Sequence, residues 1–402
     1  MAEYKYLLGN FGQAGTAEEI MCELPLYNVS WSESLNAPGA FTGSLLLDDP
    51  KATPENIKPG ARTLYVVRDG KIEWGGILWR ARTGAIDSAR TIELQCEGFW
   101  SMLRRIHLNH NMDFFCKPHM QVAYELANMA KLYADCREAP SNSHDWWCIQ
   151  PGSGFNFGDA TVTKNYKGEE LNNFGQMIED LAARNGIYGD TTQNSKDAGF
   201  DFYFNVEWES QGVAGANGIF HGLYWGFPRK GIEKPVVLRQ NPLMENFEFS
   251  IDAYPMANVV HVAGGGSGDG RPVGTYINAG SFPEYRYMST AFTSSDTESQ
   301  WVCDVLAITS GQALGGPIVQ PSITMLLNSS NEETFMDLTV GDTIKIQIND
   351  GIMQTSGEGQ PFRIRELSYA LDDGGVMRIT FQFFTRSDKE RALNLGELGY
   401  GE

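Results

Sequence analysis

The sequence predicts a mainly β protein of the α+β class, with two similar small β-barrel domains near the two ends of the chain. Three observations support this prediction: the composition, the alternation of apolar and polar residues, and a segment near the start that recurs near the end. The chain has 402 residues, including 44 Gly, 22 Phe, 16 Tyr and 9 Trp. Glycine favours turns and aromatic residues favour strands, so this mixture favours short strands over long helices.

The recurring segment is the strongest internal feature. In each copy a Gly opens a strand, an Asp-Gly turn closes it, and two Ile residues fifteen positions apart mark the strands that follow. The second copy has six additional residues, which the loop Gln354–Pro361 can absorb, and each copy follows an apolar strand. We interpret the pattern as a duplication; two unrelated hairpins with the same turn chemistry are the alternative. The matched positions are Gly60, Asp69-Gly70, Ile77 and Ile92 in the first copy and Gly341, Asp350-Gly351, Ile364 and Ile379 in the second, preceded by Phe41–Leu47 and Ile323–Leu327.

Alternation with a period of two supports strands in both copies. It is clear in Thr91–Glu97 and in Met377–Phe383, and it places one face of each strand on a core. Several short antiparallel strands with turns between them suggest a small barrel. The second copy carries polar Lys345 and Gln347 on its outer face, where we match Leu64 and Val66 in the first. Such an apolar pair is covered by another domain or subunit, or by a helix of the same chain.

Helical periodicity appears between the two copies. Pro118–Cys136 places Val122, Leu126, Met129 and Tyr133 on one face, and Asn172–Arg184 does the same with Phe174, Met177, Ile178 and Leu181. An alternating strand follows at residues 200–208. A third helix is predicted from a capping box at Ser295 and Glu298, with Trp301, Val305 and Ile308 on its apolar face. We therefore predict four domains: an N-terminal barrel (1–108), an inserted α+β domain (109–235), a connecting domain of strand, loop and helix (236–315), and a second barrel with a C-terminal tail (316–402).

The charge and the cysteines exclude several classes of protein. A formal charge of −19 argues against wrapping duplex DNA and against docking on anionic lipid, since both need clustered Lys and Arg. No run of 18 apolar residues predicts a membrane span, and the first residues do not resemble a secretory signal. The six cysteines are scattered without a C-x-x-C pair, so we expect reduced thiols, with an isolated Cys136–Cys148 bridge as the alternative.

Four segments could carry chemistry, and we weighed each against a structural role. The glycine-rich run Gly264–Gly270 lacks the Lys-Ser/Thr of a phosphate loop and is followed by Arg271-Pro272, so we predict a loop. His110, Cys116 and His119 lie close in sequence but match no zinc pattern. Asp48-Asp49 and Asp372-Asp373 stand where turns are expected. The aromatic groups Trp146-Trp147 and His221–Trp225 could stack on sugars but more often fill a core. We assign no catalytic, cofactor-binding or metal-binding residue, and we expect no enzyme.

Two stretches of the sequence resemble minor tail proteins of siphophages that infect actinobacteria. Glu73–Trp79 resembles the W-x-G-I-[VL]-W strand of that family, and Leu94–Arg105 resembles its alternating strand that ends near Gly-Phe before a helical S-x-L-x-R-R. The later order, from Asn246 through Val259–Gly264 to the second barrel, is similar too. The likeness covers about three-quarters of the chain. It lies in the order of the segments and in their types of residue, because no single motif is diagnostic.

This resemblance implies a tail-tip or baseplate hub in the virion, assembled in the host cytoplasm. In the family, each chain has two barrel domains, and three chains form a homotrimeric ring of six barrels around the tail channel. The implied partners are the distal tail and tail tube proteins, the tape measure protein, and other minor tail and receptor-binding proteins. DNA would pass through the ring without specific binding, and a negative channel wall would repel its phosphates.

Two other functions remain open from the sequence. A tail-associated glycosidase or peptidase that acts on the cell wall would need carboxylates or a metal to converge in a cleft. A carbohydrate-binding host-recognition protein would remain monomeric and would bind polysaccharide through exposed Trp residues.

Overall fold

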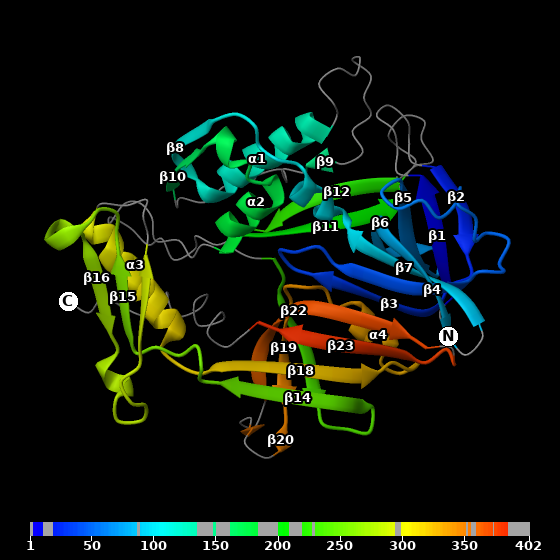
Figure 1. Ribbon diagram of the computed structural model, residues 1–402. Coiled ribbons are helices and arrows are strands. Elements are labelled where there is room, and N and C mark those ends of the chain that lie inside the picture. The colour runs from blue at the N-terminus through cyan, green and yellow to red at the C-terminus, as the bar shows by residue number, and fades with distance from the viewer. Residues whose placement is uncertain are drawn as a thin grey trace.

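The computed structural model describes residues 3–10, 19–86, 89–134, 148–149, 161–183, 200–208, 219–226, 230–293, 299–350, 353–354, 359–372 and 374–384. Strands dominate the molecule, which confirms the mainly β prediction. Most of them belong to one 13-stranded sheet, which curls into two β units (Figure 1). An inserted α+β domain covers part of this sheet, and a connecting domain lies at the end of the molecule away from the N-terminal β unit.

The N-terminal β unit has the strand order β3-β4-β7-β6-β5-β1-β2. The sheet curls until β1 faces β3 and β4: the rings of Tyr4 and Trp31 lie 5.8 Å apart, and those of Tyr6 and Phe41 lie 6.3 Å apart. The turn between β5 and β6 is the predicted one, because Asp69 (φ 47°) and Gly70 (φ 84°) both take the left-handed conformation of a type I′ hairpin. The strands are β1 (Tyr4–Asn10), β2 (Glu19–Leu24), β3 (Tyr27–Ser34), β4 (Ala40–Leu46), β5 (Arg62–Arg68), β6 (Lys71–Ile86) and β7 (Ala89–Gly98).

The C-terminal β unit has the order β14-β18-β23-β22-β19-β13, in which β13 runs parallel to β19. Its first two strands in the chain precede residue 316, so the predicted boundary at that residue leaves out β13 and β14, which pair with β19 and β18. The elements are β13 (Glu233–Arg239), β14 (Met244–Asp252), β18 (Ile318–Leu326), α4 (Glu332–Met336), β19 (Thr343–Gln347), β22 (Gln360–Leu371) and β23 (Met377–Phe383), with a small arm of β20 (Asn349–Asp350) and β21 (Met353–Gln354).

The two β units repeat the same strand order. The series β3-β4-β7-β6-β5 corresponds to β14-β18-β23-β22-β19. Both β6 and β22 carry a bulge at the corresponding place, after Leu78 in one and after Ile364 in the other. The structure therefore aligns Ile364 with Leu78, whereas the sequence-based match had aligned it with Ile77, one residue earlier. Ile92 and Ile379 correspond as predicted. The six additional residues of the second copy fall where β20 and β21 extend the hairpin.

The two units share one sheet and one core. Strand β22 pairs with β3 from Glu366↔Ser34 to Leu371↔Val29, and the stacked rings of Trp31 and Tyr369 lie 5.2 Å apart across this junction. Buried side chains of both units, from Leu8 to Phe383, belong to a single apolar cluster. The two barrel-like units are therefore not separate bodies.

The outer face of β5 differs from its prediction by one residue. Leu64 and Val66 point into the shared core, and Tyr65 and Val67 form the outer face. That face is apolar and is covered by the inserted domain of the same chain, through Val206 on β11. The one-residue shift arises because the strand is buried on both faces, so its sequence does not alternate.

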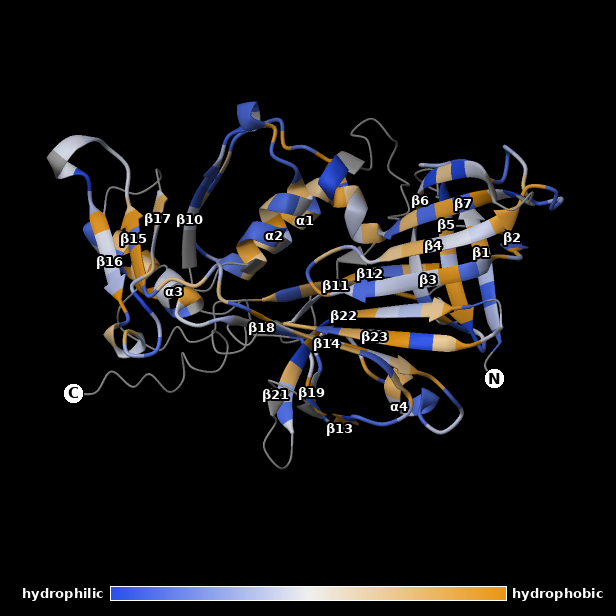
Figure 2. Cartoon of the chain, turned by 60° about the horizontal axis from the view of Figure 1, so that its bottom comes forward, coloured by the Kyte–Doolittle hydropathy of each residue, from blue (hydrophilic) through white to orange (hydrophobic). Residues whose placement is uncertain are grey.

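The inserted domain packs two helices on a small sheet. Helices α1 (His119–Ala134) and α2 (Phe174–Ala183) fall close to their predicted ranges and lie over β11 and β12 with apolar residues on both (Figure 2). The predicted apolar residues Phe174, Met177, Ile178 and Leu181 are all buried. The remaining elements are η1 (Phe99–Arg105), β8 (Met112–Pro118), β9 (Cys148–Ile149), β10 (Thr161–Tyr166), η2 (Gly168–Glu170), β11 (Asp201–Trp208) and β12 (Ile219–Gly226).

The connecting domain packs one helix on a three-stranded sheet, and the predicted helix face is wrong. Helix α3 buries Cys303 and Ala307, whereas Trp301 is 44% exposed. Small residues face the sheet because the helix and the sheet approach closely: a Cβ on Gly274 of the sheet would lie 2.1 Å from the backbone oxygen of Cys303, and a Cβ on Gly311 would lie 1.9 Å from the Tyr276 ring. The capping box at Ser295 and Glu298 lies outside the described residues. The elements are β15 (Val259–Ala263), η3 (Gly268–Gly270), β16 (Val273–Ile277), η4 (Ala279–Ser281), β17 (Ser289–Thr293) and α3 (Gln300–Leu314).

Helix length gives no sign of a membrane span. No helix in the described part of the chain is long and apolar enough to cross a bilayer.

Candidate functional site

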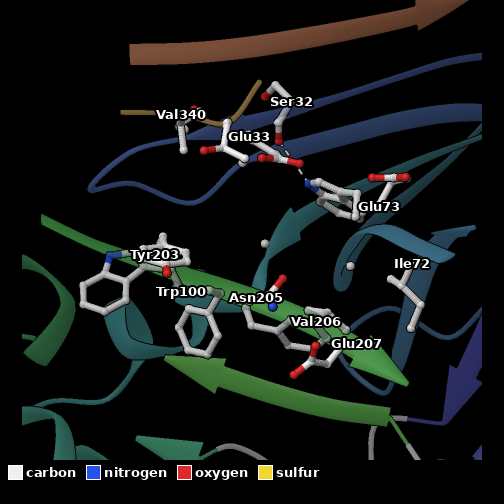
Figure 3. Close-up of a pocket in the computed structure, with 18 of the residues that line it drawn as sticks. Ser32, Glu33, Ile72, Glu73, Trp100, Tyr203, Asn205, Val206, Glu207 and Val340 are labelled. Atoms are coloured by element: carbon white, nitrogen blue, oxygen red, sulfur yellow. Dashed lines mark hydrogen bonds between the residues drawn. The ribbon is translucent and has the colours of Figure 1, made fainter. Parts of the chain in front are cut away.

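A cavity of about 830 Å³ lies where the two β units and the inserted domain meet. Strand β3 and the segment before β19 supply one wall, with Glu33 and Val340, and β11 supplies the facing wall, with Tyr203, Asn205 and Val206 (Figure 3). Because its walls come from segments far apart in the sequence, the cavity marks the junction of the three parts.

Two side chains of opposite charge line this cavity. Burial raises the pKa of Glu33 to about 7, although the cation of Lys230 acts in the other direction. Burial also lowers the pKa of Lys230, against the attraction of Glu33, Asp342 and Asp201. The ammonium group of Lys230 lies 4.1 Å from the centre of the Tyr203 ring, a cation–π contact that partly offsets its burial.

A buried ion pair fastens the inserted domain to the C-terminal β unit. Asp201 at the start of β11 pairs with Arg363 on β22, and their side chains are only 6% and 9% exposed. Arg363 also donates to the carbonyl oxygens of Gly341 (3.1 Å) and Lys230 (3.0 Å), so its charge is met by three acceptors. Asp201 accepts from the backbone N–H of Lys230 at 2.7 Å. Buried charges persist only when they are paired and hydrogen-bonded in this way.

The same network reaches the N-terminal β unit and closes the junction. Asn36, in the turn after β3, donates to Asp201 at 2.9 Å and accepts from the backbone of Phe202 at 2.8 Å. Asp342 accepts from the backbone N–H of Ile232 at 3.0 Å. Gly231 lies so near that a Cβ there would be 2.1 Å from the Gly341 carbonyl oxygen, and its φ of 95° also favours glycine.

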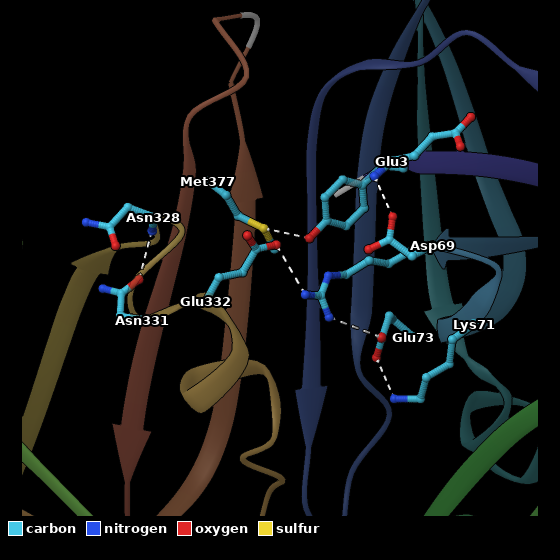
Figure 4. Close-up of polar contacts among 10 residues, drawn as sticks. Glu3, Asp69, Lys71, Glu73, Asn328, Asn331, Glu332 and Met377 are labelled. Carbon is cyan, nitrogen blue, oxygen red and sulfur yellow. Dashed lines mark hydrogen bonds and ion pairs between the residues drawn. The ribbon is translucent and has the colours of Figure 1, made fainter. Parts of the chain in front are cut away.

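A second group of polar contacts joins the two β units directly (Figure 4). The hydroxyl of Tyr4 donates to the sulfur of Met377 at 2.9 Å. Arg68 at the end of β5 pairs with Glu332 of α4 at 3.2 Å and with Glu73 at 3.8 Å. These contacts hold the edges of the units together around the shared core.

The chemistry available in the cavity is limited. A two-carboxylate hydrolase needs both groups to converge on one bond. Glu33 shares the cavity with Glu73, whose carboxylate is already held by Lys71 (3.1 Å) and Arg68, and with Glu207, which is exposed on β11. The cavity thus holds Glu33 facing the cation of Lys230, while Glu73 is engaged in ion pairs, an arrangement that suits a structural junction.

The residues His110, Cys116 and His119, for which no metal site was predicted, differ in their surroundings. His119 is buried at the start of α1, whereas Cys116 is exposed on β8, and within the described ranges no three His, Cys, Asp or Glu side chains could hold a metal ion. The Cys136–Cys148 alternative falls partly outside the described residues. Cys22, Cys96, Cys116 and Cys303 are free thiols.

The turn and loop predictions agree with the structure where it describes them. Asp49 accepts from the backbone N–H of Lys51 at 2.8 Å, and Asp372 does the same for Val376 at 2.8 Å. Asp373 lies outside the described residues. The segment Gly264–Gly270 is the hairpin loop between β15 and β16, and no α-helix follows it.

The two aromatic groups have different outcomes. Trp146 and Trp147 lie outside the described residues. His221 is buried on β12, where its Nε2 lies 2.9 Å from the Tyr65 hydroxyl, and Trp225 packs with Phe200 and Phe202. This second group fills the core of the inserted domain and its contact with the N-terminal β unit.

Sequence reasoning missed the residues of the junction itself. The alternation at residues 200–208 marks Asp201 only as a polar position of a strand, and no pattern singles out Asn36, Lys230 or Arg363. One signal was present: an Asp between two buried Phe residues at the start of a strand needs a partner if both faces are covered.

Comparison with known proteins gives a likeness in fold. No family model matches the sequence, and no curated protein matches it. Three solved structures match nearly the whole chain: the 43 kDa tail protein of prophage MuSo2 from Shewanella oneidensis (12% identity, TM-score 0.61, 96% of this chain and 99% of that one), a tail protein from Neisseria meningitidis (13%, 0.53, 95% and 96%), and prophage tail protein gp18 from Listeria monocytogenes (11%, 0.53, 99% and 100%). The chain has the fold of phage tail proteins.

Proposed function

We propose that this phage-tail-fold chain is a structural hub protein at the tip of a long non-contractile bacteriophage tail. The observation that carries the proposal is the likeness in fold to three tail proteins along nearly the full length of both chains. The resemblance of Glu73–Trp79 and Leu94–Arg105 to siphophage minor tail proteins favours this kind of tail and an actinobacterial host.

The duplicated β units favour a homotrimer. Two equivalent units per chain give six units in a ring of three chains, which matches a sixfold tail tube on one side and a threefold tip on the other. The tube, the tape measure protein and the receptor-binding proteins are the expected neighbours. The net charge of −19 suits a channel wall that repels DNA phosphates, and a ring whose lumen is neutral or basic would count against that role.

The connecting domain offers a surface for other tail proteins. It exposes the large apolar side chains of Tyr254 (97%), Tyr287 (65%), Ile277 (57%) and Trp301 (44%). Where such side chains form a contiguous patch, they mark a contact with another protein.

Localisation in the intact virion tests the proposal. We expect cryo-electron microscopy of the phage to place the chain at the tail tip, in three copies around the channel. A chain found outside the tail would refute the proposal. A monomer that cleaves peptidoglycan would refute it in favour of a cell-wall-degrading enzyme.

A further inference from the structure

Among the strand edges that lack a partner in the part of the chain that the structure describes, those of β14 and β6 occupy related places in the two β units. Strand β14 pairs with β18 on one side only. Strand β6 pairs with β5 up to Ile77, and from Arg80 to Ile86 it pairs only with β7. An unpaired edge presents a row of N–H and C=O groups that can bind another strand.

The junction inside the chain shows what binds the equivalent edges. In the repeated strand order, β22 corresponds to β6 and β3 corresponds to β14. The edge of β22 after its bulge pairs antiparallel with β3, and this pairing joins one β unit to the next. The corresponding pairing of β6 with β14 cannot form within one chain, because six strands separate them in the sheet.

The register of this second junction follows from the first. When the two β units are aligned by their bulges, Arg80 on β6 corresponds to Glu366 on β22. The residue pairing of β3 with β4 and of β14 with β18 likewise makes Asp252 on β14 correspond to Ser34 on β3. Since Glu366 pairs with Ser34, the same register sets Arg80 opposite Asp252. Two residues further along, it sets Arg82 opposite Ser250, and then Gly84 opposite Glu248.

The charges on the two edges are complementary. Arg80 and Arg82 are exposed on β6, in a chain whose overall charge is strongly negative. Glu248 and Asp252 are exposed on β14. Opposite charges on facing strands favour pairing, and like charges oppose it.

We propose that the Arg80–Ile86 edge of β6 in one copy pairs antiparallel with Met244–Asp252 of a second copy. The contact uses different surfaces on the two copies, so successive copies add head to tail and close into a ring when the rotation allows. This inference rests on the proposed hub function and names the surface through which that hub assembles.

Charge reversal in the full chain tests the contact. We expect the Arg80→Glu/Arg82→Glu variant and the Glu248→Lys/Asp252→Lys variant each to raise the midpoint concentration of self-association about tenfold or more in light scattering. Combining all four substitutions again gives the two edges opposite charges, with the directly facing pair at positions 80 and 252 reversed, so it should return the midpoint towards that of the parent chain. The matched control, Arg239→Glu on β13 with Glu23→Lys on β2, changes exposed charges on other strands of the sheet and should leave the midpoint unchanged.

Cysteine pairs test the register. Under mild oxidation, Arg82→Cys/Ser250→Cys should give a ladder of covalent oligomers. Thr83→Cys/Ser250→Cys should not, because a shift of one residue places the two side chains on opposite faces. Self-association that no reversal weakens, or a chain that stays monomeric at every concentration tested, overturns the strand pairing. The hub function is judged separately, by the position of the chain in the virion.

Discussion

Replacing Arg363 with leucine removes the cation from the most deeply buried ion pair among the residues that the structure describes. The carboxylate of Asp201 stays at the junction with its exposed fraction of 6%, and the carbonyl oxygens of Gly341 and Lys230 lose their donor. The carboxylate keeps its hydrogen bonds from Asn36 and from the backbone of Lys230, but it loses the cation paired with it, so the folded state carries much of the cost of its desolvation.

The expected loss is about 3–5 kcal/mol of unfolding free energy, the range found when one partner of a buried pair is removed. That is a large share of the roughly 5–15 kcal/mol that stabilises a folded protein. Removing both charges in Asp201→Leu/Arg363→Leu should cost less than the single change, because no unpaired charge remains.

Urea denaturation followed by tryptophan fluorescence and by circular dichroism measures this loss. We also expect Arg363→Leu to split the transition, because the pair ties the inserted domain to the C-terminal β unit. Arg378→Leu is the matched control: it removes a partly exposed arginine that pairs with Glu245 and Asp372, and it should change the stability by less than about 1 kcal/mol. If Arg363→Leu lowers the stability by less than about 1 kcal/mol, the junction is not held by a desolvated charge pair.

Three further predictions test other parts of the fold. The pKa of Glu33 is raised from 4.5 to about 7, so the folded state holds a proton that the unfolded state releases between these values. The free energy of unfolding should therefore fall by up to about 3 kcal/mol as the pH rises from 4.5 through 7. The melting temperature of Glu33→Gln should lack this fall, and a variant whose melting temperature changes with pH as that of the parent chain does would contradict the prediction. Gly311→Ala should displace α3 from its sheet and cost about 1–3 kcal/mol in urea denaturation, whereas Gly316→Ala, with open space around it, should cost little. Trp31→Ala should cost about 3–5 kcal/mol, measured the same way, since the ring is buried between the two β units; a loss below about 1 kcal/mol would show that the units do not depend on each other there.

The sequence predicted what depends on local chemistry. The Asp69-Gly70 turn requires two residues that tolerate positive φ, and the residues themselves supply that information. The face of α2 is marked by four large apolar residues, all of which are buried. The mainly β class followed in the same way from alternation and composition.

The failures have long-range causes. Helix α3 packs through Cys303 and Ala307, and the reason lies in the close approach of a sheet that the helix sequence does not reveal. The outer face of β5 was assigned one residue out of place because both of its faces are buried. The Asp201–Arg363 pair joins residues 162 positions apart, and the walls of the cavity also come from distant segments, which no local pattern can bring together.

The inserted domain explains why two units of common architecture now differ. On β5 the outer face holds Tyr65 and Val67, and β11 and β12 cover it. On β19 the corresponding face holds the polar residues Lys345 and Gln347. The proposed ring of three chains would therefore alternate units with an apolar outer face and units with a polar one. Its sheet could follow the sixfold symmetry of a tube while its outer surface keeps the threefold symmetry that a tip requires.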